Sequence, residues 1–368
     1  MAQMQLAARP APPWAGRRAG DDYGMAAKPD WREVDWAPHV RSMEIDGRRV
    51  NYADYGEPRD DARPVVLVHG LAACWQCWLE QIPRLAAEGR RVVALDLPGF
   101  GASEMPAEKI SIEGFGRTVE SLCDELDLGQ VVLVGHSMGG FTAAEMAIQY
   151  PRRVERLVLQ AAAGISSNDL KREPLMAGAR VVAAFGARAA ASSRRVAARP
   201  RARWAALQAA IRYPSRIPAD FAYELLSHAG TDGFLPAMEA IMAYDFRDRL
   251  PSVECPTLVV WGDKDALVPL SDADQYARSI PNARKVVFED TGHSPMMERP
   301  ESFNELLLEF LGEERAERPS EAELERSEDG AGARSGSDAN GEAAAAGGTA
   351  NGGGGTAAAG AAPAGDAA

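Results

Sequence analysis

Cysteine is scarce in this sequence of 368 residues, and long apolar runs are missing. Four cysteines are too few for a disulfide scaffold, and they suit a reducing compartment. No stretch approaches the roughly 18 consecutive apolar residues that a membrane-spanning helix needs. The first thirty residues also lack the apolar core of a secretory signal. The sequence therefore predicts a cytoplasmic protein without a transmembrane segment.

An excess of positive charge is absent as well. The chain has 53 acidic and 40 basic residues, a formal net charge of −13 and a pI near 5.0. Such a balance argues against nucleic acid as a partner. One segment, 171–216, is positively charged instead, with eleven basic residues and a single acid, Glu173. It could attract an anionic substrate or an acidic lipid surface, or simply present solvated arginines, and the sequence leaves these readings open.

Both ends of the chain lack the apolar patterning of a core. Residues 1–30 are rich in Pro, Arg and Gly and are predicted to be a disordered N-terminal arm. Residues 314–368 are predicted to be a disordered, acidic tail rich in Gly and Ala. The folded part is therefore expected between residues 31 and 313.

Between these ends, short apolar runs alternate with helical patterns. The runs are about four residues long and rich in β-branched side chains, as is typical of strands buried on both faces of a parallel sheet. They span 65–68, 92–95, 131–134, 157–159, 257–260 and 285–288. Before them, two alternating segments flank Asp46-Gly47, a hairpin signal. The pattern predicts an α/β fold with a mostly parallel sheet and helices on both faces.

The alternation stops between residues 165 and 250. No parallel-type strand is visible there, and Ala, Arg, Met and aromatic residues recur at helical spacing. We therefore expect a core made of 31–164 and 251–313, interrupted by a helical cap at 165–250. The larger apolar side chains of this insert either line an acyl pocket or form the core of the cap. They are Phe185, Trp204, Phe221, Phe234 and Met238.

A glycine-flanked serine follows one of the expected strands. Residues 135–139 read Gly-His-Ser-Met-Gly, between the run at 131–134 and a helical stretch that ends near Tyr150. A tight turn from strand to helix lifts the Ser137 hydroxyl above the sheet, while the two glycines leave room for neighbouring backbone. The positive end of the following helix favours the negative charge that develops during attack on a carbonyl. Ser137 is therefore the predicted nucleophile.

Histidine, the usual base for such a serine, occurs only five times, at positions 39, 69, 136, 228 and 293. His293 follows the last expected strand, in a loop of the kind that collects catalytic groups in open α/β sheets. His69 and His136 adjoin other motifs and are interpreted as structural. The carboxylate that orients His293 is expected in the loop after strand 257–260, which offers Asp263 and Asp265.

The combined motifs resemble the α/β-hydrolase superfamily, in the form that carries a helical cap. The resemblance covers residues 40–312 and rests on five segments: Val68-His69-Gly70, 96–103, 135–140, Trp261–Asp265 and Gly292-His293. It implies the triad Ser137, Asp265 and His293 in the order Ser…Asp…His. It also implies an oxyanion hole made by the backbone N–H groups of Leu71 and Met138, with no cofactor or metal.

The same resemblance implies a serine hydrolase that cleaves a small carboxylic ester with an apolar acyl group, through an acyl-enzyme. Relatives that break carbon–halogen bonds or open epoxides have an aspartate where Ser137 stands. Relatives that cleave carbon–carbon bonds usually have an asparagine where this chain has His136. A carbon–carbon hydrolase, an acyltransferase, a cofactor-free perhydrolase and a non-catalytic ligand-binding relative remain as alternatives. The substrate-binding residues and the oligomeric state stay open.

Cys74 and Cys77 form a Cys-x-x-Cys pattern. Such a pair can serve redox chemistry or bind a metal, but no second Cys or His pair accompanies it at zinc spacing. We interpret the two cysteines as small residues at the start of a helix, where Trp75 and Trp78 pack.

Overall fold

An eight-stranded sheet runs through the computed structural model, which describes residues 10–12, 14–24, 27–59, 61–169, 172–228 and 230–313. Its strands are β1 Val40–Ile45, β2 Arg48–Tyr55, β3 Val65–Val68, β4 Val92–Leu95, β5 Val131–His136, β6 Val154–Gln160, β7 Thr257–Gly262 and β8 Ala283–Phe288. They lie in the order β1-β2-β4-β3-β5-β6-β7-β8. The hairpin β1–β2 and the pair β2–β4 are antiparallel, and every other pair is parallel. The predicted hairpin and mostly parallel sheet are confirmed.

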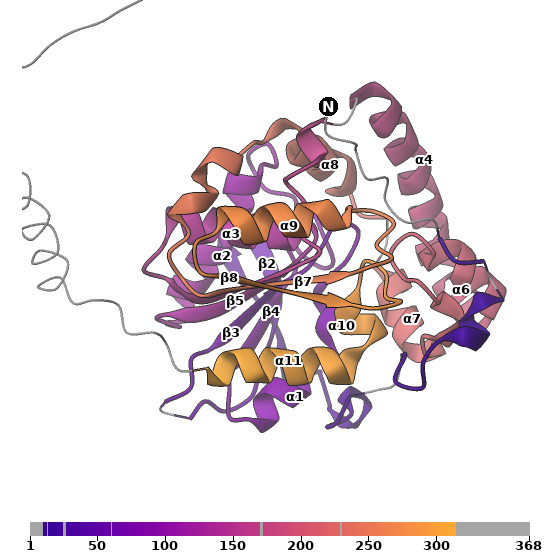
Figure 1. Cartoon of the computed structure of the whole chain (residues 1–368), viewed down its shortest axis with the longest axis horizontal. Helices are drawn as coiled ribbons and strands as arrows, with labels where there is room; N and C mark the ends of the chain where they lie inside the picture. The colour runs from indigo at the N-terminus through magenta and orange to yellow at the C-terminus, as the bar shows by residue number, and fades with distance from the viewer. Residues whose placement is uncertain are drawn as a thin grey trace, which may run out of the picture. The chain divides into compact units, whose positions relative to one another are not determined.

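Helices cover both faces of this sheet (Figure 1). One face carries α2 Ile112–Glu125, α3 Met138–Gln149 and α9 Leu270–Ser279, and the other carries α1 Ile82–Ala87 and α11 Pro300–Gly312. Along β3, Val66 and Val68 pack into the first layer, while Val65 and Leu67 pack into the second. All four side chains are fully buried. This burial on both faces explains why the strands are continuously apolar in sequence.

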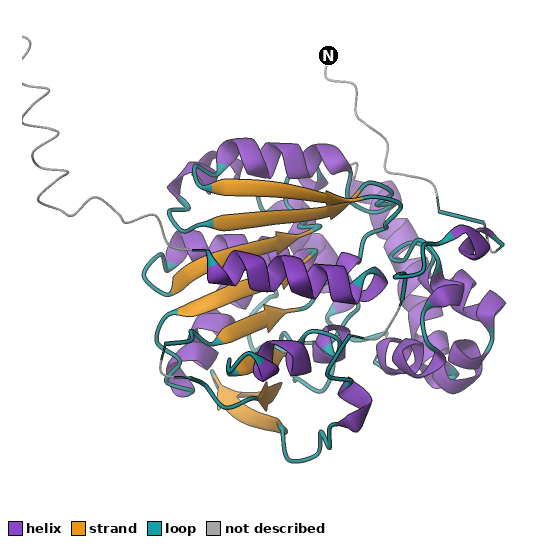
Figure 2. Cartoon of the chain, turned by 60° about the horizontal axis from the view of Figure 1, so that its bottom comes forward, coloured by secondary structure: helices purple, strands orange, loops and turns teal. Residues whose placement is uncertain are grey.

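The segment between β6 and β7 is a helical insert. Its elements are η4 Ser167–Asp169, α4 Arg172–Ala191, α5 Ser193–Ala198, α6 Pro200–Leu207, η5 Pro214–Arg216, α7 Ala219–Ser227, α8 Phe234–Ala243 and η6 Arg247–Ser252. Helices α4, α6 and α7 lie together beyond one end of the sheet, the end toward which the parallel strands run (Figures 1 and 2). Phe221 and Phe234 are buried, whereas Phe185 on α4 is 69% exposed. Phe185 is therefore not part of the core of the insert.

The structure differs from the prediction that residues 1–30 are disordered. In the described part of this arm, Ala11, Tyr23 and Ala27 are at most 2% exposed. The Ala27 N–H donates to Glu80 Oε2 at 2.8 Å, and the Trp204 indole N–H donates to the Ala11 carbonyl at 2.7 Å. The described part of the arm packs on surfaces that distant parts of the chain provide, and composition alone does not reveal such surfaces. The predicted tail at 314–368 lies outside the described residues.

Two tryptophans, one in the arm and one directly after it, test this packing. Trp31 is 8% exposed, donates to Glu80 Oε1 at 3.0 Å and lies with its ring centroid 6.2 Å from that of Phe221. Trp14 is 70% exposed. We expect Trp31→Ala to lower the free energy of unfolding by about 3–5 kcal/mol, and Trp14→Ala to change it by less than about 0.5 kcal/mol. Denaturant titration measures both values, and equal losses would contradict the packing described here.

Candidate active site

Ser137 occupies a strained turn between β5 and α3. Its backbone has φ 54° and ψ −116°, a region that non-glycine residues rarely adopt. The Ser137 N–H donates to the Gln160 carbonyl at 2.9 Å, and the Ser137 carbonyl accepts from the Ala163 N–H at 3.1 Å. A Cβ on Gly135 would collide with the Gly139 carbonyl oxygen, and one on Gly139 would collide with the Val68 carbonyl oxygen. The two glycines are therefore required for the turn to sit this close to β3.

The loop after β3 lies directly against this turn. A Cβ on Gly70 would stand 3.0 Å from the Ser137 Cβ. His69 holds the loop, because its Nε2 accepts from the Leu97 N–H at 2.9 Å and its Nδ1–H donates to the Gly70 carbonyl at 2.7 Å. Burial lowers the pKa of His69, in agreement with this neutral tautomer. Leu71 is the next residue of this loop. Met138 is the first residue of α3, so its N–H has no intrahelical acceptor.

His293 and Asp265 form a buried pair. They follow β8 and β7, and their Nδ1 and Oδ2 atoms are 2.7 Å apart. Because an ionised carboxylate can only accept, Nδ1 carries the proton and Nε2 is left as the basic nitrogen. The other oxygen, Oδ1, accepts from the N–H groups of Leu267 and Val268 at 2.8 and 2.9 Å. Asp265 is thus held by its own loop while it orients the imidazole.

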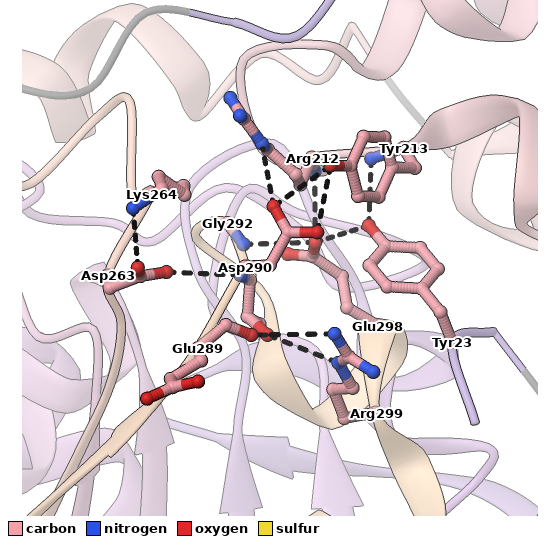
Figure 3. Close-up of polar contacts among 11 residues, drawn as sticks. Tyr23, Arg212, Tyr213, Asp263, Lys264, Glu289, Asp290, Gly292, Glu298 and Arg299 are labelled. Carbon is pink, nitrogen blue, oxygen red and sulfur yellow. Dashed lines mark hydrogen bonds and ion pairs between the residues drawn. The ribbon is translucent and has the colours of Figure 1, made fainter. Parts of the chain in front are cut away.

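Asp263, the second candidate carboxylate, contacts a different part of the histidine loop (Figure 3). Its Oδ1 accepts from the Thr291 N–H at 3.3 Å, and its Oδ2 accepts from the Lys264 ammonium at 2.5 Å. Asp263 thereby joins the loop after β7 to the loop after β8. Within the loop after β7, the N–H groups of residues 267 and 268 donate to Asp265. Of the two aspartates, Asp265 is the one that the structure brings to His293.

His136 supports the backbone of His293 from the side of β5. The two ring centroids are 4.8 Å apart, and the His136 Nε2–H donates to the His293 carbonyl at 3.1 Å. The same carbonyl accepts from the Gln160 side-chain amide at 2.9 Å. Burial, and then the neighbouring His293, lower the pKa of His136 well below its usual value. His136 is therefore a neutral structural donor, as predicted, and Gln160 is a support that the sequence analysis missed.

The sequence analysis also missed Glu298, in the short helix α10 Pro295–Glu298 (Figure 3). Its side chain is fully buried. The carboxylate accepts from the Gly292 N–H at 3.0 Å and from the Ser294 N–H at 3.0 Å, and these two residues precede and follow His293. It also accepts from the Arg212 N–H of the insert at 2.9 Å. These three donors are backbone amides, which leave no mark in a sequence, so they could not have been found from a motif.

The Cys-x-x-Cys pair is buried inside the protein. Cys74 and Cys77 are both free and fully buried. Burial raises the pKa of each thiol well above its usual value, which disfavours the reactive thiolate. Within the described ranges, no group of three or more His, Cys, Asp or Glu side chains is arranged to hold a metal ion. No helix in the described part of the chain is both long and apolar enough to cross a membrane.

A family model described as the alpha/beta hydrolase fold matches residues 63–300. Among curated proteins, the dihydrolipoyllysine-residue acetyltransferase component of the acetoin cleaving system of Pseudomonas putida is 33% identical over 281 residues, which cover 74% of this chain and 70% of that protein. The 2-hydroxy-6-oxononadienedioate/2-hydroxy-6-oxononatrienedioate hydrolase 2 of the same organism is 30% identical, with coverage of 74% and 94%.

Solved structures show the same architecture. The enol-lactonase from Burkholderia xenovorans LB400 aligns with a TM-score of 0.62 at 26% identity, over 74% of this chain and 100% of that chain. A thermophilic esterase from Thermogutta terrifontis aligns with a TM-score of 0.59 at 28% identity, over 74% and 96%.

The strain at Ser137 predicts a stability difference between two substitutions that both remove the hydroxyl. Glycine adopts a positive φ without a Cβ clash, whereas alanine keeps the Cβ. We expect Ser137→Gly to have a free energy of unfolding about 1 kcal/mol higher than Ser137→Ala, even though glycine loses more chain entropy on folding. Parallel denaturant titrations give the difference, and a more stable alanine variant would show that the turn is unstrained.

Proposed function

The chain belongs to the α/β-hydrolase fold family, and within it we propose a serine hydrolase that cleaves a carboxylic ester through an acyl-enzyme. The observation that carries this proposal is the buried 2.7 Å contact between His293 and Asp265, on loops that follow neighbouring strands. It lies beside the strained turn that presents Ser137, since the His293 ring is 4.8 Å from that of His136. An imidazole oriented by a carboxylate next to a serine on such a turn suits nucleophilic attack on a carbonyl.

In the proposed reaction, Nε2 of His293 takes the hydroxyl proton of Ser137 as the oxygen attacks the ester carbon. The tetrahedral intermediate collapses, the acyl group stays on Ser137, and His293 returns the proton to the leaving alcohol. Water then gives a proton to the same nitrogen and attacks the acyl-enzyme, which releases the acid and restores the serine. Asp265 stabilises the imidazolium that forms in each half of the cycle.

We assign the oxyanion to the N–H groups of Leu71 and Met138. Met138 is the first residue of α3, so the partial positive charge of the helix end adds to its N–H. Leu71 follows Gly70, whose close approach to Ser137 brings this loop to the same spot. Each donor of this kind contributes on the order of 3 kcal/mol to stabilising the transition state.

The helical insert is proposed to act as the cap over this site. It contacts two of the loops that surround Ser137 and His293. The Gly233 N–H donates to the Gly99 carbonyl at 3.0 Å, in the loop after β4. On the other side, the Tyr213 hydroxyl donates to the Asp290 carboxylate at 2.8 Å, in the histidine loop. A segment held at both places is suited to select the acyl or alcohol part of the substrate.

Carbon–carbon hydrolysis is the second candidate, because one similar protein is the 2-hydroxy-6-oxononadienedioate/2-hydroxy-6-oxononatrienedioate hydrolase, of which this chain covers 94%. Nucleophilic attack on a ketone would use the same serine, histidine and oxyanion donors. Ester cleavage is favoured by the structural likeness to an enol-lactonase and an esterase. A panel of nitrophenyl esters of two to sixteen carbons, assayed beside a 2-hydroxy-6-oxo-dienoate, separates the two.

Ser137→Ala tests the nucleophile. We expect the wild-type protein to hydrolyse nitrophenyl esters and to be labelled by a fluorophosphonate probe, and the variant to do neither. The acyl-enzyme cannot form without the hydroxyl, so kcat should fall by about 10⁴–10⁶. Probe labelling and ester turnover measure both effects. Activity of the variant within tenfold of the wild type would contradict the assignment.

Asp265→Asn and Asp263→Asn separate the two aspartates. Asp265→Asn replaces the acceptor of the Nδ1–H, so the wrong tautomer is favoured and kcat should fall by about 10³–10⁴ with folding intact. Asp263→Asn keeps an oxygen for the Thr291 N–H, so kcat should stay within about tenfold and stability should drop by about 1 kcal/mol. Steady-state kinetics and thermal melts on both variants decide the matter, and the reverse pattern would move the role to Asp263.

A further inference from the structure

Three segments that are far apart in the sequence meet at the buried carboxylate of Glu298 (Figure 3). The histidine loop contributes the N–H groups of Gly292 and Ser294, and the insert contributes the N–H of Arg212. The N-terminal arm contributes the hydroxyl of Tyr23, which donates to Oε2. Four donors from three segments therefore converge on one side chain.

Glu298 determines where the backbone of His293 lies. The N–H groups of Gly292 and Ser294, the residues before and after His293, both donate to its carboxylate, and a Cβ on Gly292 would stand 2.9 Å from its Oε1. On the opposite side, the His293 carbonyl is held by His136 and Gln160. Among the residues that the structure describes, the imidazole itself has one hydrogen-bond partner, Asp265, so its place relative to Ser137 depends on how firmly this backbone is held.

We propose that Glu298 is a positioning residue for His293, and that the N-terminal arm and the insert hold it in place through the Tyr23 hydroxyl and the Arg212 N–H. This inference rests on the proposed function, in which His293 is the base. It gives the arm a part in catalysis although the arm lies outside the residues matched by the family model.

The Tyr23 hydroxyl joins all three segments. It donates to Glu298 and accepts from the Tyr213 N–H at 2.8 Å, at the start of η5 in the insert. Burial raises the pKa of Tyr23 well above its usual value, so the phenol keeps the proton that it donates. Burial also raises the pKa of Glu298, and the four donors oppose that rise. Because a buried carboxylate is costly without donors, losing one of them lets the side chain shift.

The ring of Tyr23 is held independently of its hydroxyl. It packs edge-on against the Tyr213 ring with centroids 5.2 Å apart, and the Arg299 guanidinium lies 5.2 Å from its centroid. The next residue, Gly24, donates its N–H to the Glu298 backbone carbonyl at 2.8 Å. Tyr23→Phe therefore removes the two hydrogen bonds of the hydroxyl and leaves the arm with its other contacts.

The matched control is Asp220→Asn. Asp220 accepts from Arg32 at 2.5 and 3.0 Å, so it ties the segment that directly follows the arm to the insert, while the hydrogen bonds to Glu298 come from other groups. Both variants therefore weaken contacts between the N-terminal part of the chain and the insert. Only Tyr23→Phe changes the donors around Glu298.

The experiment compares kcat, KM and hydrogen–deuterium exchange for the full chain, well below its melting temperature, with a nitrophenyl ester. We expect Tyr23→Phe to lower kcat about tenfold with KM within twofold, because small displacements of a catalytic group slow the chemical step. Exchange over 289–299 should become faster. Asp220→Asn should keep kcat within twofold and leave that exchange unchanged. Glu298→Gln, which replaces one acceptor oxygen with an NH₂ group, should lower kcat further than Tyr23→Phe.

Several results would overturn the inference. An unchanged kcat for Tyr23→Phe, even with a lower melting temperature or faster exchange, would make Glu298 a purely structural anchor. Equal losses of kcat in Tyr23→Phe and Asp220→Asn would assign the effect to general loosening of the arm. If Tyr23→Phe failed to fold, a Glu298→Gln variant with wild-type kcat would likewise make Glu298 a structural anchor only. Failure of the proposed function is seen separately, since the wild-type protein would then resist the fluorophosphonate probe.

Discussion

The turn at Ser137 is the constraint around which the rest of the site is arranged. A strand passes into a helix through one residue with φ 54°, and the turn needs glycine at 135 and 139 because backbone from β3 and α3 lies where side chains would stand. This close approach places the loop after β3 beside the start of α3. It also ties Ser137 to β6 and the segment after it, through Gln160 and Ala163. The strain is tolerated because neighbours on both sides hold the same backbone.

Buried carboxylates then hold the loops that surround this turn. Asp96 accepts from the N–H groups of Trp75 and Ala102 at 2.8 and 2.9 Å, so it joins the loops after β3 and β4. Asp265 accepts from N–H groups of its own loop after β7 and from His293 in the loop after β8, and Glu298 accepts from two N–H groups of the loop after β8. A carboxylate can accept several bonds at once, and in a buried site these bonds are strong. Irregular loops thereby acquire the fixed geometry that catalysis requires.

Much of this arrangement could be predicted from local patterns. The continuously apolar runs predicted the parallel strands, since a strand buried on both faces has no polar side, and Asp46-Gly47 predicted the hairpin β1–β2. Ser137 and His293 were predicted because each lies in a motif after the end of a strand, and the resemblance to the α/β-hydrolase superfamily singled out Asp265 from the two aspartates after β7. The contact between Asp265 and His293 agrees with that prediction, and the roles of the three residues remain our proposal. The arm at 1–30 was predicted to be disordered, whereas its described part is packed and holds the buried Tyr23 and Ala27.

The sequence by itself thus determined the α/β fold, the insert between β6 and β7, and the positions of the candidate catalytic residues, because each of these depends on residues close together in the chain. Only the tertiary structure decided which partners the buried groups find. Tyr23 and Glu298 are 275 residues apart, and Glu298 meets three backbone amides that any residue type could supply. Hydrogen bonds of this kind depend on where the backbone lies, so they cannot be predicted from a pattern of side chains in the sequence.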